Sequence, residues 1–338
     1  MNHLIYTLLT NQPAPAGTTA GQLARAEQEI GWARQHGVRL LTRDDADYPQ
    51  RLLRTPEAPD VLFVSGPADL NAVHAVSIVG TRRITPYGRD LCQRICRELH
   101  HWLPDTLVVS GLAYGVDYET HRAALAAGLP TVGVVAHGLD RIYPAAHRPT
   151  AVEMVRHGGG IVTEYLTQTE PMKGNFVRRN RIVAGLTEAT IVVESAKQGG
   201  SLITAGLAVD YGRRLLACPG RLGDVASEGC NRLVAKGMAI PFTSVEDLLE
   251  QLHWVSTQTG EQSLFGPEEM PSVNTAALPP DERRLLDLLA TTDGLQAHDI
   301  PARAGLSTFR VTTLLFKLEM MGLIEALPGG AYRKRTFS

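Results

Sequence analysis

Residues 170–204 read EPMKGNFVRRNRIVAGLTEATIVVESAKQGGSLIT, a cationic segment followed by an apolar run and a glycine-rich turn. No acidic residue lies between Lys173 and Glu188. The apolar run, 190–193, is typical of a strand, and the turn 198–201 (QGGS) follows it. Turns of this kind direct backbone N–H groups into a concavity that suits an anion. A positive segment beside such a turn predicts a phosphate site.

The cationic segment holds Lys173, Arg178, Arg179 and Arg181, with Phe176 among them. An aromatic ring among cations suits a nucleobase, which stacks on the ring while the charges bind phosphate. A more ordinary interpretation also fits, in which the arginines line a solvated helix face and Phe176 belongs to the core. The segment alone leaves both interpretations open.

Outward from this stretch, apolar strand-like runs alternate with helix-length segments. The runs are 61–64, 75–79, 107–110, 131–135, 161–163, 190–193 and 215–217. Such Val, Ile and Leu runs, separated by helices, predict a parallel sheet with helices on both faces. Parallel sheets bind ligands at the carboxyl ends of their strands. Glycine-rich loops stand at three of those ends: 80–83, 111–115 and 198–201.

Length and composition fit a soluble globular protein of two or three domains: 338 residues, 44% hydrophobic and 20% charged. Because the formal net charge is -2, nucleic-acid binding must come from local cationic patches. The N-terminus is a poor signal peptide, and no run of about 18 apolar residues predicts a membrane span. The four cysteines lack zinc-site spacing, so we expect buried thiols, no metal site and a cytoplasmic location.

Four regions follow from these patterns. Residues 1–36 form a small helical region, 37–255 an α/β domain, 256–277 a polar linker and 278–338 a compact helical module. Residues 263–265 (SLF) are an apolar island in the linker. They fit either a local packing contact or a short docking motif for a partner.

The C-terminal module is typical of a winged helix–turn–helix. We expect three helices and a hairpin, at 281–290, 298–304, 307–321 and 322–332. Arg310 and Lys317 are seven residues apart and share a face of the third helix. Arg333 begins a basic tail. These three cations are candidate contacts to duplex DNA, and a protein-docking role for the module fits equally well.

Together the loop motifs resemble the DprA/Smf family, DNA-processing proteins of bacterial natural transformation. The resemblance is strong over about residues 47–253 and weaker over the C-terminal module. It rests on these stretches, in the family's order: Tyr48-Pro49 with Leu52; Val79-Gly80-Thr81-Arg82 with Tyr87-Gly88; Ser110-Gly111-Leu112-Ala113 with Gly115-Val116-Asp117 and His121; Gly138-Leu139-Asp140 with Tyr143-Pro144; Arg179-Asn180-Arg181; Gly200-Ser201-Leu202-Ile203-Thr204; and Pro219-Gly220.

The resemblance implies a Rossmann-like domain that binds single-stranded DNA, forms homodimers and loads the recombinase RecA onto incoming strands. It implies a binding protein rather than an enzyme, and no cofactor. In the family, an arginine binds phosphate, a lysine contacts the strand and an aromatic ring stacks on a base. Arg82, Lys173 and Phe176 hold these positions. The predicted site comprises Gly80, Thr81, Arg82, Ser110, Gly111, Lys173, Phe176, Arg179, Asn180, Arg181, Gly200 and Ser201.

The chain departs from the family pattern at three positions. Cys230 replaces a threonine, Gly199 replaces a serine, and His137 is unusual before the following glycine. None of these changes removes a charge from the predicted groove. Asp117 and His121 lie one helical turn apart and suggest acid–base chemistry. An aspartate at a helix start is nevertheless expected to bind loop amides.

Several of the predicted contacts have structural alternatives. Asn180 also fits a hydrogen bond to a loop backbone, and one of the neighbouring arginines fits an ion pair with Glu164 or Glu194. Two other functions fit parts of the sequence: a nucleotide-cleaving enzyme of a related Rossmann-like family, and a winged-helix transcription regulator. The enzymes resemble this chain but have a catalytic glutamate where Gly206 stands. The motif match in the central domain disfavours the regulator.

Overall fold

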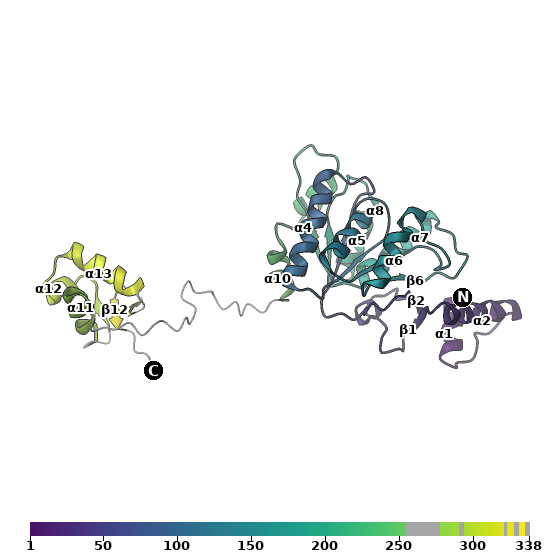
Figure 1. Cartoon of the computed structure of the whole chain (residues 1–338), viewed down its shortest axis with the longest axis horizontal. Helices are drawn as coiled ribbons and strands as arrows, with labels where there is room; N and C mark the ends of the chain where they lie inside the picture. The colour runs from purple at the N-terminus through teal and green to yellow at the C-terminus, as the bar shows by residue number, and fades with distance from the viewer. Residues whose placement is uncertain (255–277, 291–293, 321–322, 328–330, 335–338) are drawn as a thin grey trace. The chain divides into compact units, whose positions relative to one another are not determined.

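The computed structural model describes residues 1–254, 278–290, 294–320, 323–327 and 331–334. The chain forms two compact units, Met1–Thr259 and Gly260–Ser338 (Figure 1). The predicted linker, with its apolar island, lies outside the described residues, as do residues 322 and 328–330 of the predicted hairpin.

The first unit is built on a nine-stranded sheet with the order β1-β2-β6-β5-β4-β3-β7-β8-β9. The strands are β1 Arg39–Thr42, β2 Val61–Ser65, β3 Ala75–Val79, β4 Leu107–Ser110, β5 Thr131–Val134, β6 Gly160–Thr163, β7 Ala189–Val192, β8 Arg214–Ala217 and β9 Ile240–Pro241. From β6 to β9 all neighbouring strands are parallel. The predicted parallel sheet is confirmed there, whereas β1 and β2 extend its edge in antiparallel pairs.

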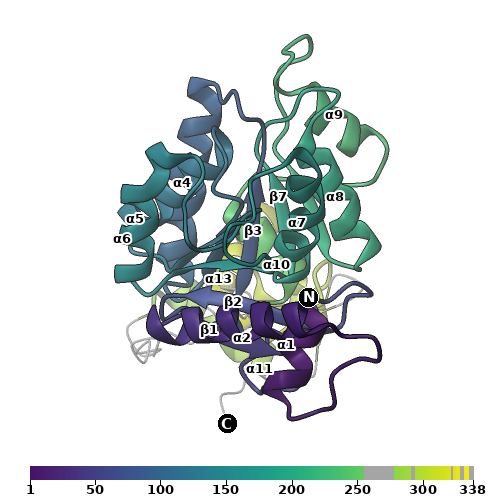
Figure 2. The ribbon, with the colours of Figure 1, turned by 90° about the vertical axis from the view of Figure 1, so that its right-hand side faces the viewer.

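Helices cover both faces of the sheet, as the sequence predicts. One face carries α4 Pro86–Trp102, α5 Val116–Ala127, α6 Arg148–Arg156 and α10 Val245–Leu252; the other carries α3 Gln50–Leu53, α7 Lys173–Gly185, α8 Gly200–Asp210 and α9 Glu228–Ala235. Figure 2 shows α4, α5 and α6 on one side of β3 and α7, α8 and α9 on the other. Within β3, Val76 and Ile78 pack toward α4, while Ala75 and Val79 pack toward α7. Both faces are therefore apolar, because side chains alternate along a strand.

The N-terminal helices share a core with the edge of the sheet. They are α1 Asn2–Leu9 and α2 Ala20–Gln35, and Thr19 begins α2 with a capping box. Ile5 and Ile30 pack against Val61 and Phe63 of β2. The helical region therefore folds onto the sheet through β1 and β2.

The second unit has the predicted winged helix–turn–helix elements. Its helices are α11 Pro280–Ala290, α12 Ile300–Ala304 and α13 Thr308–Met320, and its strands are β10 Leu295–Gln296, β11 Ile324–Leu327 and β12 Ala331–Lys334. The strand order is β10-β12-β11. Leu285, Leu289, Val311 and Leu318 form part of the core. The two-residue strand β10 was not predicted, because so short a segment has no period of its own.

A buried histidine should make the stability of the first unit depend on pH. His121 of α5 is fully buried, and its Nδ1–H donates to the Thr131 hydroxyl at 2.7 Å, since that hydroxyl itself donates to the Val108 carbonyl. Burial lowers the pKa of His121 from 6.5 to about 3. Between pH 6.5 and about 3, His121 is therefore protonated in the unfolded chain but stays neutral in the folded chain. Stability is full above pH 6.5 and falls as the pH drops, by about 2 kcal/mol at pH 5.

Urea unfolding at pH 7.5 and at pH 5 tests this expectation in the natural chain and in His121→Leu. All three tryptophans, Trp32, Trp102 and Trp254, lie in the first unit, so their fluorescence reports its unfolding alone. The natural chain should lose about 2 kcal/mol more on acidification than the variant. Equal losses would show that His121 does not carry the pH dependence.

Candidate nucleic-acid interface

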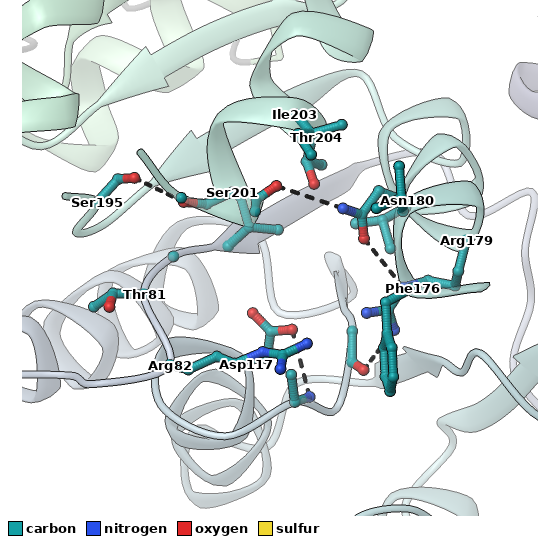
Figure 3. Close-up of a pocket in the computed structure, with 18 of the residues that line it drawn as sticks. Thr81, Arg82, Asp117, Phe176, Arg179, Asn180, Ser195, Ser201, Ile203 and Thr204 are labelled. Carbon is teal, nitrogen blue, oxygen red and sulfur yellow. Dashed lines mark hydrogen bonds between the residues drawn. The ribbon is translucent and has the colours of Figure 1, made fainter. Parts of the chain in front are cut away.

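A cavity of ≈650 Å³ opens at the carboxyl ends of β3, β4 and β7 (Figure 3). The chain runs from β3 through α4 toward one end of the sheet and from β7 through α8 toward the other. The loops therefore diverge between β3 and β7, and open α/β sheets bind ligands at such a point. Most of the predicted site lines this cavity: Gly80, Thr81, Arg82, Gly111, Lys173, Phe176, Arg179, Asn180, Gly200 and Ser201.

Arg82 and Phe176 project into the cavity from opposite walls, one from the loop after β3 and the other from α7 (Figure 3). The guanidinium carbon of Arg82 lies 5.2 Å from the centroid of the Phe176 ring, within cation–π range. The Thr81 amide donates to the Glu194 carbonyl at 2.8 Å, and the Thr81 carbonyl accepts from the Val116 amide at 3.0 Å. These bonds fix the loop, so Arg82 is held at the mouth of the cavity.

Two glycines bring the loop after β3 against the start of α5. A Cβ atom on Gly80 would lie 2.5 Å from the Val116 side chain. Gly115 has φ +81°, and its Cβ would lie 2.2 Å from the Thr81 carbonyl oxygen. Only glycine permits both the positive φ and the close approach. Packing alone therefore requires glycine at both positions.

Arg179 forms the floor of the cavity. Its side chain is buried, and Nη1 donates to the carbonyls of Val134 and, at 2.6 Å, of Gly111. Asp117 faces it across Gly111: a Cβ on Gly111 would lie 2.5 Å from Asp117 Oδ2 and 2.6 Å from Arg179 Nη2. Burial lowers the pKa of Arg179 and raises that of Asp117, and each charge opposes the other's shift. The Ala113 amide donates to Asp117 at 3.4 Å, so this aspartate binds a loop amide as predicted.

Arg181 does not line the cavity, which corrects the prediction that it shares the groove with Arg179. It is buried, and Nη2 donates to Glu164 at 2.5 Å. Positions 179 and 181 are about 200° apart around a helix, so the two side chains point to opposite sides. The alternative ion pair with Glu164 is the one that forms. Glu194 instead accepts from the amide and hydroxyl of Thr85 and fixes the loop before α4.

The polar side chains beside the cavity hold loops together. Ser110 lies outside the cavity lining, and its hydroxyl donates to the Ile78 carbonyl at 2.6 Å. The Ser201 hydroxyl donates to the Ser195 hydroxyl at 2.9 Å. Asn180 donates weakly to the Gly200 carbonyl at 3.5 Å. The Ser201 hydroxyl pairs with another hydroxyl and not with a histidine or carboxylate that would activate it as a nucleophile. The Ser110 hydroxyl also interacts with the Asp117 carboxylate, a contact that lowers the pKa of Asp117 against the effect of burial.

Two helix N-termini open on the cavity, those of α7 and α8. Neither has a side-chain cap or an acidic residue in its first turn, so the partial positive charges there are uncompensated. Lys173 begins α7 and is exposed. The carboxylates that reach α7 pair with Arg178 and Arg181, and no residue in the described part of the chain forms an ion pair with Lys173 or Arg82. This edge of the sheet is suited to an anion.

Sequence reasoning missed the apolar part of the lining. Val177 and Ile203 line the cavity, and both are more than 40% exposed. Tyr143, also exposed, lies 6.0 Å from Phe176 between ring centroids. Exposed Val and Ile on an amphipathic helix read as core positions in a sequence. Of these three residues, only Tyr143 had a signal in the sequence, because it belongs to the Tyr143-Pro144 motif on which the family resemblance rests.

Two of the candidate duplex contacts of the second unit, Arg310 and Lys317, form ion pairs within that unit. Arg310 lies 3.2 Å from Asp281, and Lys317 lies 2.6 Å from Glu282, both acids being on α11. Arg333 is exposed on β12. In the described residues no cluster of three metal-ligating side chains occurs, and no helix is long and apolar enough to span a membrane.

Comparisons with known proteins identify the family of the chain. The family model of DNA recombination-mediator protein A matches residues 39–253, and that of the DprA winged helix domain matches residues 269–330. Protein Smf of Escherichia coli K12 is 36% identical over 317 residues, which cover 91% of this chain and 81% of that protein. DNA processing protein DprA of Bacillus subtilis is 36% identical over 222 residues, covering 65% and 73%.

Two solved structures are similar as well. DNA processing protein A of Streptococcus pneumoniae matches with a TM-score of 0.62 and 31% identity, covering 74% of this chain and 91% of that chain. DNA processing protein A of Helicobacter pylori, described for its single-stranded DNA binding mode, matches with a TM-score of 0.56 and 30% identity, covering 64% and 96%. The chain therefore belongs to the DNA recombination-mediator protein A family, which includes the DprA and Smf proteins.

Proposed function

We propose that this protein binds single-stranded DNA in the cavity between β3 and β7 and acts in DNA recombination. The observation that carries the proposal is the placement of Arg82 over Phe176, beside Lys173 and two uncapped helix N-termini. The Helicobacter pylori relative, described for single-stranded DNA binding, supports it. This reading makes the chain a binding protein rather than an enzyme.

The roles of the residues follow from their chemistry. Arg82 and Lys173 pair with phosphates, and the N–H groups at the start of α8, including Gly200, donate to phosphate oxygens. Phe176 stacks on an unpaired base, whose face is available only when it has left a duplex stack. Arg179 shapes the floor and supports the ring, its guanidinium carbon lying 6.0 Å from the ring centroid. Close packing at Gly80 and Gly111, together with the backbone hydrogen bonds of Thr81, holds the loops in the positions that shape the cavity for the strand.

Fluorescence anisotropy of a labelled single strand, compared with the matched duplex over a salt series, tests this function. The natural chain should bind the single strand more tightly, with affinity falling as salt rises. Lys173→Ala should weaken binding and reduce the log–log salt slope by about 0.7, the share of one phosphate. Lys236→Ala is the control, since Lys236 is an exposed lysine that does not line the cavity. Equal or stronger duplex binding, unaffected by Lys173→Ala, would refute the proposal.

The finer assignments rest on the family resemblance. We propose that the protein forms a homodimer, so that two cavities engage one strand and raise apparent affinity through effective concentration. We further propose that it loads RecA onto the bound strand and works in the cytoplasm, which its four buried free thiols support. Sedimentation at increasing concentration measures the oligomeric state. RecA filament formation on strands coated with this protein measures loading, with Lys173→Ala as the comparison.

A further inference from the structure

A second groove, of ≈620 Å³, continues from the cavity across the outer side of α7. Three side chains line both spaces, Lys173, Val177 and Ile203. The groove is therefore an extension of the cavity, and anything that leaves the cavity past Lys173 enters it.

The groove combines an apolar base with a rim that is cationic on balance, because Lys173, Arg178 and Arg181 outnumber the one acid in the lining, Glu57. Val177 of α7 and Ile203 of α8 are 45% and 42% exposed, and Leu207 lies one turn beyond Ile203 on the same helix face. Arg178 lines the groove but not the cavity, and its side chain is 63% exposed. At Gly174, which also lines the groove, no atom lies within 4 Å of the place a Cβ would take, so the space above α7 is open.

We propose that the groove is a second subsite for single-stranded DNA, occupied by the nucleotide next to the one held in the cavity. The proposal rests on the function proposed above. A base would lie on Val177, Ile203 and Leu207, and its phosphate would pair with Arg178. Lys173 and Arg178 are five residues apart, about 7.5 Å along the helix axis, so they serve successive points of one strand. The apolar base and cationic rim match the bases and phosphates of a single strand.

The acidic surface beyond Arg178 marks the end of the path. Glu57, which also lines the groove, is joined in the next hollow by Asp60 and Glu164, and Arg178 and Arg181 line both spaces. Arg181 pairs there with two carboxylates, at 2.5 Å from Glu164 and 3.6 Å from Glu57. Phosphate would be repelled from these carboxylates. The subsite is therefore short, and lengthening an oligonucleotide beyond it should add no further affinity on this side.

Binding of an oligo-dT series of increasing length to the full chain tests the subsite. The variants are Arg178→Gln and Leu207→Gln, which alter the groove and leave the cavity lining intact. Arg156→Gln is the matched control, because Arg156 is 68% exposed and paired with one glutamate, like Arg178, but lies on α6. The shortest oligonucleotide that the natural chain binds should bind both groove variants with the same affinity. Longer oligonucleotides should bind these variants on the order of fivefold more weakly than they bind the natural chain. Arg178→Gln should also reduce the salt slope by about 0.7, for longer oligonucleotides only.

The outcomes separate this inference from the proposed function. If the natural chain binds single strands but both groove variants equal it at every length, the subsite is wrong, and the apolar groove belongs to a protein partner instead. A weakening that is the same at every length would also overturn the subsite, because it would act through the cavity. If the natural chain binds no single strand, the proposed function fails, and the subsite fails with it. Tryptophan fluorescence in urea checks that each variant is folded as stably as the natural chain.

Discussion

Arg179→Met should lower the free energy of unfolding of the first unit by about 3–5 kcal/mol. The substitution keeps an unbranched chain of similar length but removes the donor to the carbonyls of Gly111 and Val134. It also leaves the buried Asp117 without the cation that opposes its desolvation. An uncompensated buried charge costs more than the pair gains, so the effect should exceed that of a typical core substitution.

Urea unfolding followed by tryptophan fluorescence measures this change, with Arg82→Met as the matched control. Arg82 is exposed, and its guanidinium makes a cation–π contact with the Phe176 ring. Arg82→Met should therefore change the free energy of unfolding by under about 1 kcal/mol. Adding Asp117→Asn to Arg179→Met should recover part of the lost stability, because it removes the uncompensated charge. A loss in Arg179→Met no larger than in Arg82→Met would mean that Arg179 is not part of the floor and is available to DNA.

Phe176→Ala should weaken single-strand binding by about 1–3 kcal/mol, roughly 5- to 150-fold, because a base loses its stacking surface. No charge is removed, so the salt slope should stay that of the natural chain. Arg82→Gln should behave in the opposite way, with a slope reduced by about 0.7. The two variants therefore separate stacking from phosphate contact at groups whose centres lie only 5.2 Å apart.

Phe176→Trp is the control for this prediction, since a larger ring keeps the stacking surface and should retain most of the affinity. The measurement is again anisotropy across a salt series, made on variants with natural unfolding midpoints. Unchanged affinity in Phe176→Ala would show that no base stacks on Phe176. A change in the log–log salt slope of Phe176→Ala would show that removing the ring had also displaced Arg82.

Much of the site was predictable because its signals are local. Glycine loops that end apolar strands predict where the carboxyl edge of the sheet lies, and three such loops do meet there. The spacing of Lys173 and Phe176, three residues apart on one helix, places both at the same wall. Strand β1 was missed for the opposite reason. Its four residues have no pattern of their own, and β1 is defined by its pairing with β2.

The sequence by itself determined the layered α/β architecture and the edge of the sheet that holds the cavity, because side-chain periodicity and glycine loops are written along the chain. It did not determine the separate roles of Arg178, Arg179 and Arg181. Only the tertiary structure decided these, since the partners come from distant strands: Arg179 reaches carbonyls 68 and 45 residues away, and Arg181 reaches a carboxylate 17 residues away. The helical period in a sequence determines which residues share a face of the helix, but it does not determine which strand packs against that face.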